Sequence, residues 1–194
     1  MKALAGLGIV LSIVGCRVVQ DTRSVVIMQP HEGTYLWISP ESQNKLGSGG
    51  ELQIYMDPHT HPEAKASFAK FTLGVGGQLP VHRHDRTEEI SYFLSGEGVV
   101  VVVDEEGAEK EIPVGTGYVW YNPPGVWHTV RNTGPTPLSL VFVTVPNEKS
   151  GLLSYFRRVC AGPGEEGLVL SPEELEKLAS EHDLILRSSG LHER

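Results

Sequence analysis

The chain has 194 residues, of which 40% are apolar and 21% are charged, a globular composition that excludes a wholly disordered protein. Its formal net charge is −8, and no segment concentrates lysine and arginine. Because nucleic-acid affinity depends on neutralising phosphates with basic side chains, we expect no nucleic-acid partner. The length suits one domain with modest additions at its ends.

Residues 1–16 have the pattern of a bacterial lipoprotein signal. Lys2 precedes an uncharged apolar run that is too short to span a bilayer, which needs about 20 residues. The run ends in Ile13-Val14-Gly15-Cys16, which resembles a lipobox, whose cysteine becomes lipidated. We therefore expect a lipid anchor at Cys16 and an extracytoplasmic protein. The alternative is a cytoplasmic protein that begins with an apolar strand.

Residues 17–147 are expected to form strands. Residues 17–50 are predicted to be a tether with edge strands, and residues 51–147 a barrel of short strands separated by Gly and Pro turns. The valine run 99–103 predicts a strand buried on both faces. No helical period appears between residues 30 and 145, which argues against a parallel βαβ fold. The expected strands are 35–38, 51–56, 66–75, 90–94, 99–103, 108–112, 118–121, 127–131 and 138–145.

Residues 148–194 are predicted to form a helical extension. The first helix has Ser150 as its expected N-cap and an apolar stripe at helical spacing, made of Leu152, Leu153, Phe156 and Val159. The second begins at Ser171-Pro172 with Glu174 three residues after the serine, a capping box with proline at the first helical position. We expect the two helices to cover an open end or edge of the barrel.

Three histidines and a glutamate form a candidate metal site. His82 and His84 are two residues apart and share one face of a strand; Glu89 begins the next strand, and His128 follows a Pro-Pro-Gly turn. Three imidazoles and a carboxylate suit one divalent transition metal, namely Fe, Mn, Ni, Co, Cu or Zn. Spacing alone is weak evidence, because His59-Thr60-His61 repeats it between two prolines, where we expect a loop.

Ten positions over about residues 66–145 resemble the two motifs of the cupin superfamily. The resemblance implies an all-β double-stranded β-helix, a jelly-roll barrel, here with two short C-terminal helices. It also implies metal ligation by His82, His84, Glu89 and His128. The permitted gap admits Glu88 as well, but the distance to Gly96 favours Glu89. The first motif reads Gly76, His82, His84, Glu89 and Gly96, and the second reads Gly117, Pro123, Gly125, His128 and Asn132.

The resemblance also bears on function. Four protein ligands on an octahedral ion leave two positions open, which is typical of a catalytic site. A looser similarity to quercetin-dioxygenase-like cupins implies a dioxygenase-type oxidoreductase. By analogy with cupins in general, a homodimer is expected. A non-redox isomerase or lyase and a ligand-binding cupin without turnover stay open. The pocket walls for a small organic or aromatic substrate are predicted at Phe71, Ser91, Phe93, Tyr118, Trp120 and Phe142.

Overall fold

The computed structural model describes residues 25–38, 50–166 and 168–187. The predicted signal segment 1–16, Cys16 included, lies outside the described residues, as does much of the predicted tether. No helix of the described part is long and apolar enough to cross a membrane. The strands are β1 Thr34–Trp37, β2 Gly50–Met56, β3 Ser67–Leu73, β4 His82–Arg83, β5 Glu88–Ser95, β6 Glu97–Val103, β7 Glu109–Gly115, β8 Val119–Asn122, β9 Trp127–Arg131, β10 Leu138–Val145 and β11 Ile185–Leu186, and the helices are α1 Leu152–Val159 and α2 Pro172–Ser180.

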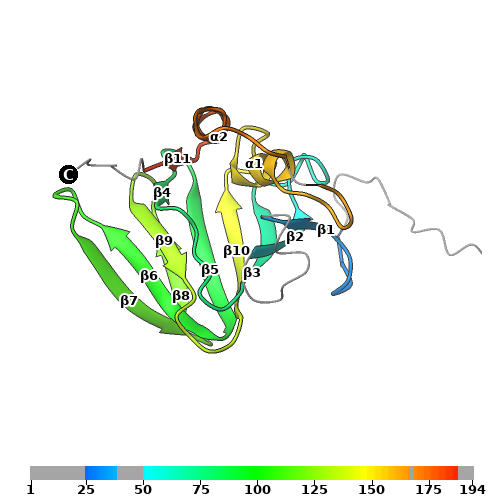
Figure 1. Cartoon of the computed structure of the whole chain (residues 1–194). Helices are drawn as coiled ribbons and strands as arrows, with labels where there is room; N and C mark the ends of the chain where they lie inside the picture. The colour runs from blue at the N-terminus through cyan, green and yellow to red at the C-terminus, as the bar shows by residue number, and fades with distance from the viewer. Residues whose placement is uncertain (1–24, 39–49, 167, 188–194) are drawn as a thin grey trace, which may run out of the picture.

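Two antiparallel sheets make up the fold (Figure 1). One has the order β1-β2-β3-β10-β5-β8 and the other β11-β4-β9-β6-β7. Most neighbours in a sheet are distant in sequence, as β10 is from β3 and β5, because the chain crosses between sheets in a jelly roll. The predicted double-stranded β-helix with two helices is confirmed, although the sheets do not close into a continuous barrel.

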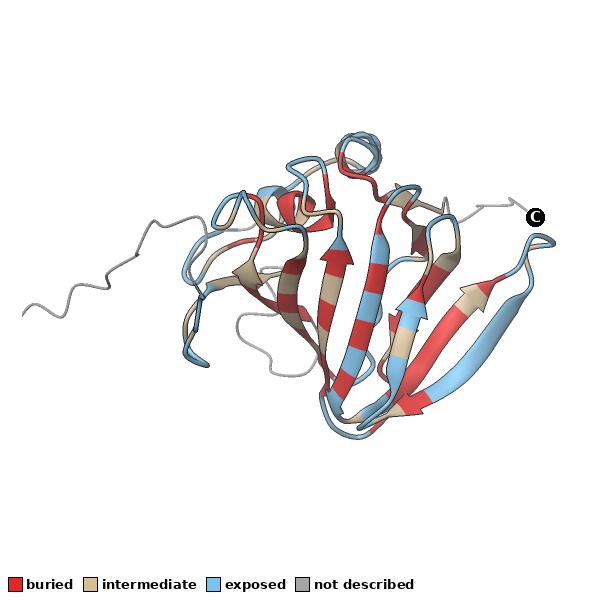
Figure 2. Cartoon of the chain, turned by 180° about the vertical axis from the view of Figure 1, so that it is seen from behind, coloured by how far each residue is buried: buried red, intermediate tan, exposed pale blue. Residues whose placement is uncertain are grey.

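The core lies between the sheets. Strand β5 alternates between exposed and buried residues along its length (Figure 2), so that Glu89, Ser91 and Phe93 face inward. Phe93, Leu52 and Ile54 are fully buried in the core, and each such side chain stabilises the fold by about 1.5–3 kcal/mol.

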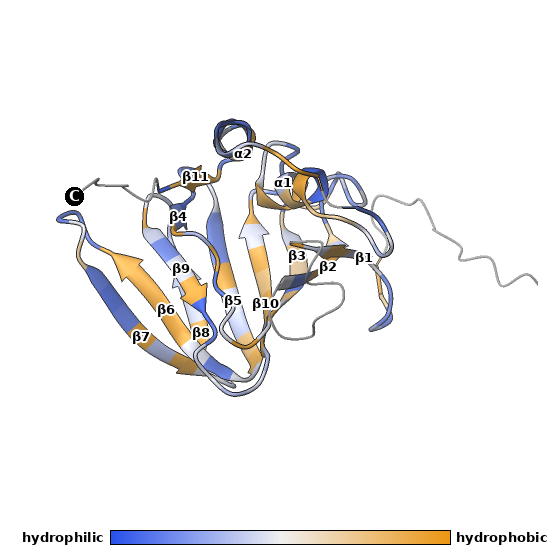
Figure 3. Cartoon of the chain, viewed as in Figure 1, coloured by the Kyte–Doolittle hydropathy of each residue, from blue (hydrophilic) through white to orange (hydrophobic). Residues whose placement is uncertain are grey.

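Strand β6 differs from β5 because nearly its whole length is buried. The valines 99–103 are buried with one intermediate position, which confirms the predicted strand. Figure 3 shows this apolar strand beside the polar β7, whose residues are mostly exposed. The two-residue period of exposure therefore holds in β5 but not in β6.

Both helices lie at one end of the sheets (Figure 1). The capping box of α2 is present: the Ser171 hydroxyl accepts from the Glu174 N–H, and the Glu174 side chain accepts from the Ser171 N–H. The prediction for α1 was wrong in its cap. The N-cap is Gly151, without a side-chain hydrogen bond, and the Ser150 hydroxyl lies 3.5 Å from the Glu148 carboxylate instead.

Candidate metal centre

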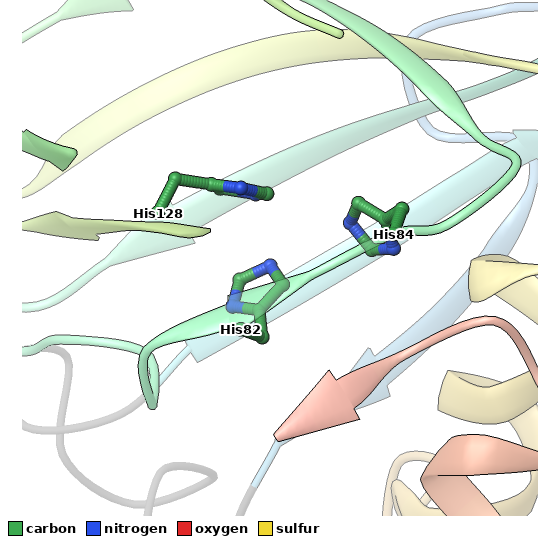
Figure 4. A group of neighbouring side chains, drawn as sticks. All are labelled: His82, His84 and His128. Carbon is green, nitrogen blue, oxygen red and sulfur yellow. The ribbon is translucent and has the colours of Figure 1, made fainter. Parts of the chain in front are cut away.

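Three imidazoles meet inside the fold. His82 lies on β4 directly opposite His128 on β9, and His84 follows β4. One ring nitrogen from each histidine lies within 4.8 Å of the others, and Figure 4 shows the three rings grouped together. The ring centroids are 4.3 Å apart for His82 and His128, and 5.4 Å for His84 and His128. The alternation of β4 and its register with β9 therefore produce the cluster.

Each imidazole is oriented by a main-chain carbonyl. The Nδ1 atoms of His82, His84 and His128 lie 2.8 Å from the carbonyl oxygens of Pro80, Asp183 and Val126, respectively. A carbonyl oxygen only accepts, so each Nδ1 carries a proton, and in the neutral form of the ring Nε2 keeps its lone pair. This is the tautomer of a histidine that binds a metal through Nε2.

The Nε2 atoms fit a metal ion. His84 Nε2 is buried without a hydrogen-bond partner, and a buried polar atom without a partner is costly unless something binds it. His128 Nε2 has one weak neighbour, the Asn122 side-chain amide at 3.3 Å. Convergent lone pairs of neutral imidazoles are a suitable donor set for a borderline divalent cation.

Burial keeps His82 and His128 neutral. It lowers the pKa of His82 well below the usual value, and the nearby His128 and His84 lower it further. Burial also lowers the pKa of His128 to about 4, against the opposing hydrogen bond to the Val126 carbonyl. Imidazoles that stay unprotonated near neutral pH are available as ligands.

Glu89 borders the three imidazoles but is not a member of the mutually close group. Its Oε2 lies 3.8 Å from His84 Nε2, and its Oε1 accepts a 3.0 Å hydrogen bond from the Ser91 hydroxyl. Burial raises its pKa, opposed by His84 and by Ser91. Glu88 is exposed on the outer face of β5, so Glu89 is the carboxylate of this pair that faces the site.

The cluster adjoins a cavity of about 380 Å³ that includes His82, Glu89 and His128 in its wall. Three predicted pocket residues, Phe71, Trp120 and Phe142, line it. The other three do not. The Ser91 hydroxyl donates to the Glu89 carboxylate instead of facing the cavity. Phe93 is fully buried in the core. Tyr118 is 55% exposed because it lies before the start of β8.

The C-terminal region contributes many residues to this wall, which its sequence pattern did not predict. Its apolar stripe indicated that the helices cover the barrel, but not that they line the pocket. Asn122 and Asp183, the polar neighbours of His128 and His84, had no motif that marked them. The lining residues from this region are Leu152, Tyr155, Phe156, Val159, Leu168, Leu170, Leu175, Leu184 and Leu186.

The second histidine pair lies apart from this cluster. His59 and His61 are in the turn between β2 and β3, which agrees with the predicted loop. Asp57 holds this turn by accepting from the Thr60 N–H and hydroxyl. His61 Nδ1 lies 3.0 Å from the Thr60 hydroxyl, and His59 Nε2 lies 3.4 Å from the Ser154 hydroxyl.

Comparison with known proteins identifies several relatives. Residues 69–144 match the family described as "Cupin domain". The oxalate-binding protein of Thermotoga maritima is 32% identical over 112 residues, which cover 56% of this chain and 88% of that protein. The oxalate decarboxylase of Bacillus subtilis is 27% identical over 109 residues, and the match covers 56% of this chain but 28% of the longer enzyme.

One solved structure agrees with the observed fold. A crystal structure from Thermotoga maritima, described as a predicted oxalate decarboxylase, is 29% identical with a TM-score of 0.51. The match covers 62% of this chain and 99% of that one. Nearly the whole of that protein therefore corresponds to part of this chain, which has additional segments of its own.

Proposed function

This chain belongs to the cupin family, and from that premise we propose that it is a mononuclear metal-dependent enzyme of the dioxygenase type. Its substrate would be a small organic molecule with an apolar, preferably aromatic, body and oxygen atoms at one end. The observation that carries this proposal is the arrangement of three convergent imidazoles and Glu89 at one side of an apolar cavity. Such a cavity with a few convergent polar groups is the usual form of a small-molecule site.

The lining supports the substrate class. Apart from His82, Glu89, His128 and the Tyr155 hydroxyl, the described wall is made of apolar, proline and tryptophan side chains, and no lysine or arginine lines it. A multiply charged anion would find no basic side chain in the described wall, so the metal would be its one cationic partner, whereas the rest of the wall offers only apolar contact. An aromatic body would instead replace water against Phe71, Trp120 and Phe142.

The residues of the chain have separate roles in this proposal. His82, His84 and His128 would hold the metal through Nε2, and the carbonyls behind them keep those rings in the binding tautomer. Glu89 would complete the ligand set or hold a proton from the substrate, because burial raises its pKa. The apolar residues exclude water and orient the substrate body. A bound transition metal supplies Lewis acidity and, if it is redox-active, a route for electrons to dioxygen.

The relatives favour a second candidate, a cupin that binds a small dicarboxylate such as oxalate. Its support is the 32% identity to the oxalate-binding protein. Against it, oxalate is a dianion of two carbons that would fill little of a cavity of about 380 Å³.

Oxygen consumption tests the proposal. Protein loaded in turn with Fe, Mn, Ni or Co is mixed with a panel of phenolic compounds, and we expect uptake of dioxygen with at least one metal. His84→Ala should abolish it, and His61→Ala should not. Turnover with zinc in the absence of oxygen would instead indicate an isomerase or lyase. Thermal stabilisation by oxalate without any turnover would favour the second candidate.

A further inference from the structure

The segment 183–187 lies against the strand that bears the metal-binding histidines. Strand β11 pairs with β4, with Leu186 opposite His82 and Ile185 opposite Arg83, and Figure 1 shows the two strands together. The Arg187 N–H donates to the Val81 carbonyl. This part of the chain is far from the histidine motif in sequence, yet it is the outer neighbour of β4 in the sheet.

Asp183, just before β11, holds the loop between His84 and Glu89. Its buried carboxylate accepts from the N–H groups of Asp85, Arg86 and Thr87 at 2.9–3.2 Å. The Thr87 hydroxyl also donates to it at 2.7 Å. An ionised carboxylate has about four acceptor sites and no donor, so these four donors match its capacity. Hydrogen bonds to a charged acceptor are stronger than those between neutral groups.

The main chain of Asp183 contacts the metal centre itself, because its carbonyl oxygen lies 2.8 Å from His84 Nδ1. Among the described residues, Asp183 is the one non-glycine residue with a positive φ, 57°. Aspartate tolerates this left-handed conformation better than most side chains. One residue thus binds both the imidazole of His84 and the loop that leads to Glu89.

We propose that Asp183 is a positioning residue for the metal centre. Its carboxylate holds residues 85–87, which sets the separation of His84 and Glu89, and its carbonyl sets the tautomer and ring plane of His84. The proposal rests on the metal site of the proposed function and extends that site beyond the cupin motifs, to residue 183. A role limited to general stability would leave the metal affinity of the folded protein unchanged.

Asp183→Asn is the principal variant. Asparagine also tolerates the left-handed conformation, but its amide turns one acceptor into a donor that faces the N–H groups of the loop. We expect the affinity for Co²⁺ to fall by about 10- to 100-fold, the usual effect of a change behind a metal ligand, and the visible absorption of the bound Co²⁺ to change. Glu181→Gln is the control, since this exposed neighbour forms an ion pair with Arg158, at 3.7 Å, whereas the N–H groups of residues 85–87 donate to Asp183.

A milder pair of variants guards against misfolding of Asp183→Asn. Thr87→Val removes one hydroxyl donor to the Asp183 carboxylate, and Thr87→Ser retains it. We expect weaker Co²⁺ binding for the valine variant and wild-type binding for the serine variant. Unchanged Co²⁺ affinity and absorption in both Asp183→Asn and Thr87→Val, with both variants folded by circular dichroism, would overturn the proposal.

Nitrogen NMR of the metal-free protein separates this inference from the proposed function. In the wild type we expect His84 to carry its proton on Nδ1. Asp183→Asn keeps the main-chain carbonyl, but the altered contacts with residues 85–87 should shift the neighbouring His84 relative to it, so we expect a mixture of tautomers in this variant. If the wild type bound no Co²⁺, the metal site would be wrong, and the tautomer would still decide whether Asp183 positions His84. A His84 spectrum identical in both proteins would overturn the positioning role.

Discussion

Two pairs of histidines with the same spacing have different surroundings in this molecule. His82 and His84 are buried, face a third imidazole, and have Nδ1 bound to main-chain carbonyls. His59 and His61 lie in a turn, and their rings contact the hydroxyl groups of Ser154 and Thr60, respectively. This difference shows that a two-residue spacing of histidines does not by itself make a metal site. The surrounding main chain and a third ligand decide whether the two rings can bind a metal.

The largest expected difference between the two histidine pairs is in metal content after a single imidazole is removed. We expect His84→Ala or His128→Ala to lower the metal content from about one ion per chain to near zero. The two imidazoles that remain in either variant should bind a metal ion only weakly. Metal analysis of protein purified without added metal measures this, with circular dichroism to check folding. His61→Ala is the matched control and should retain the metal. Full metal content in both cluster variants would show that the ion binds elsewhere.

Protonation of the buried histidine cluster should make the stability of the fold depend on pH. His128 has a pKa of about 4 in the folded metal-free protein, against about 6.5 when unfolded. Between these values the unfolded chain binds a proton that the folded chain does not, so stability falls as the pH drops from 6.5 towards 4. The expected loss from this residue is about 3 kcal/mol.

Urea unfolding in EDTA measures this loss at several pH values. His128→Gln should show a shallower decline than the wild type, because it removes the group that the unfolded chain protonates. Parallel pH profiles for the wild type and His128→Gln would contradict the assignment of the loss to His128.

The smallest effects are expected from removing the hydroxyl groups beside Glu89 and His61. Ser91 donates to Glu89, and Thr60 contacts His61. We expect Ser91→Ala to weaken Co²⁺ binding by about 10-fold, since it removes support from a carboxylate beside the ligands. Thr60→Ala should cost about 1 kcal/mol of stability through the turn but leave Co²⁺ affinity as it was. Equal Co²⁺ affinity in both variants would mean that Glu89 plays no part in binding.

The sequence predicted the strands of the core and the histidines of the site well, because both depend on local patterns. Alternation along β5 separates Glu89 from Glu88, and the two motifs pick His82, His84 and His128. The role of Asp183 was not predictable, because its contacts with His84 lie 99 residues away in the chain and involve a carbonyl group, which every residue has. Tyr118 was misplaced because alternation cannot show where a turn ends and β8 begins.

The separation of His84 and Asp183 by 99 residues in the sequence also has a consequence for the order of events during synthesis. A ribosome makes all the strands from β2 to β10, with all three imidazoles, before it makes the carbonyl that orients His84. Contacts so distant in sequence form late, after the loop between them has closed. Metal loading should therefore follow docking of β11 on β4, so that the ion binds only after residues 183–187 have been made.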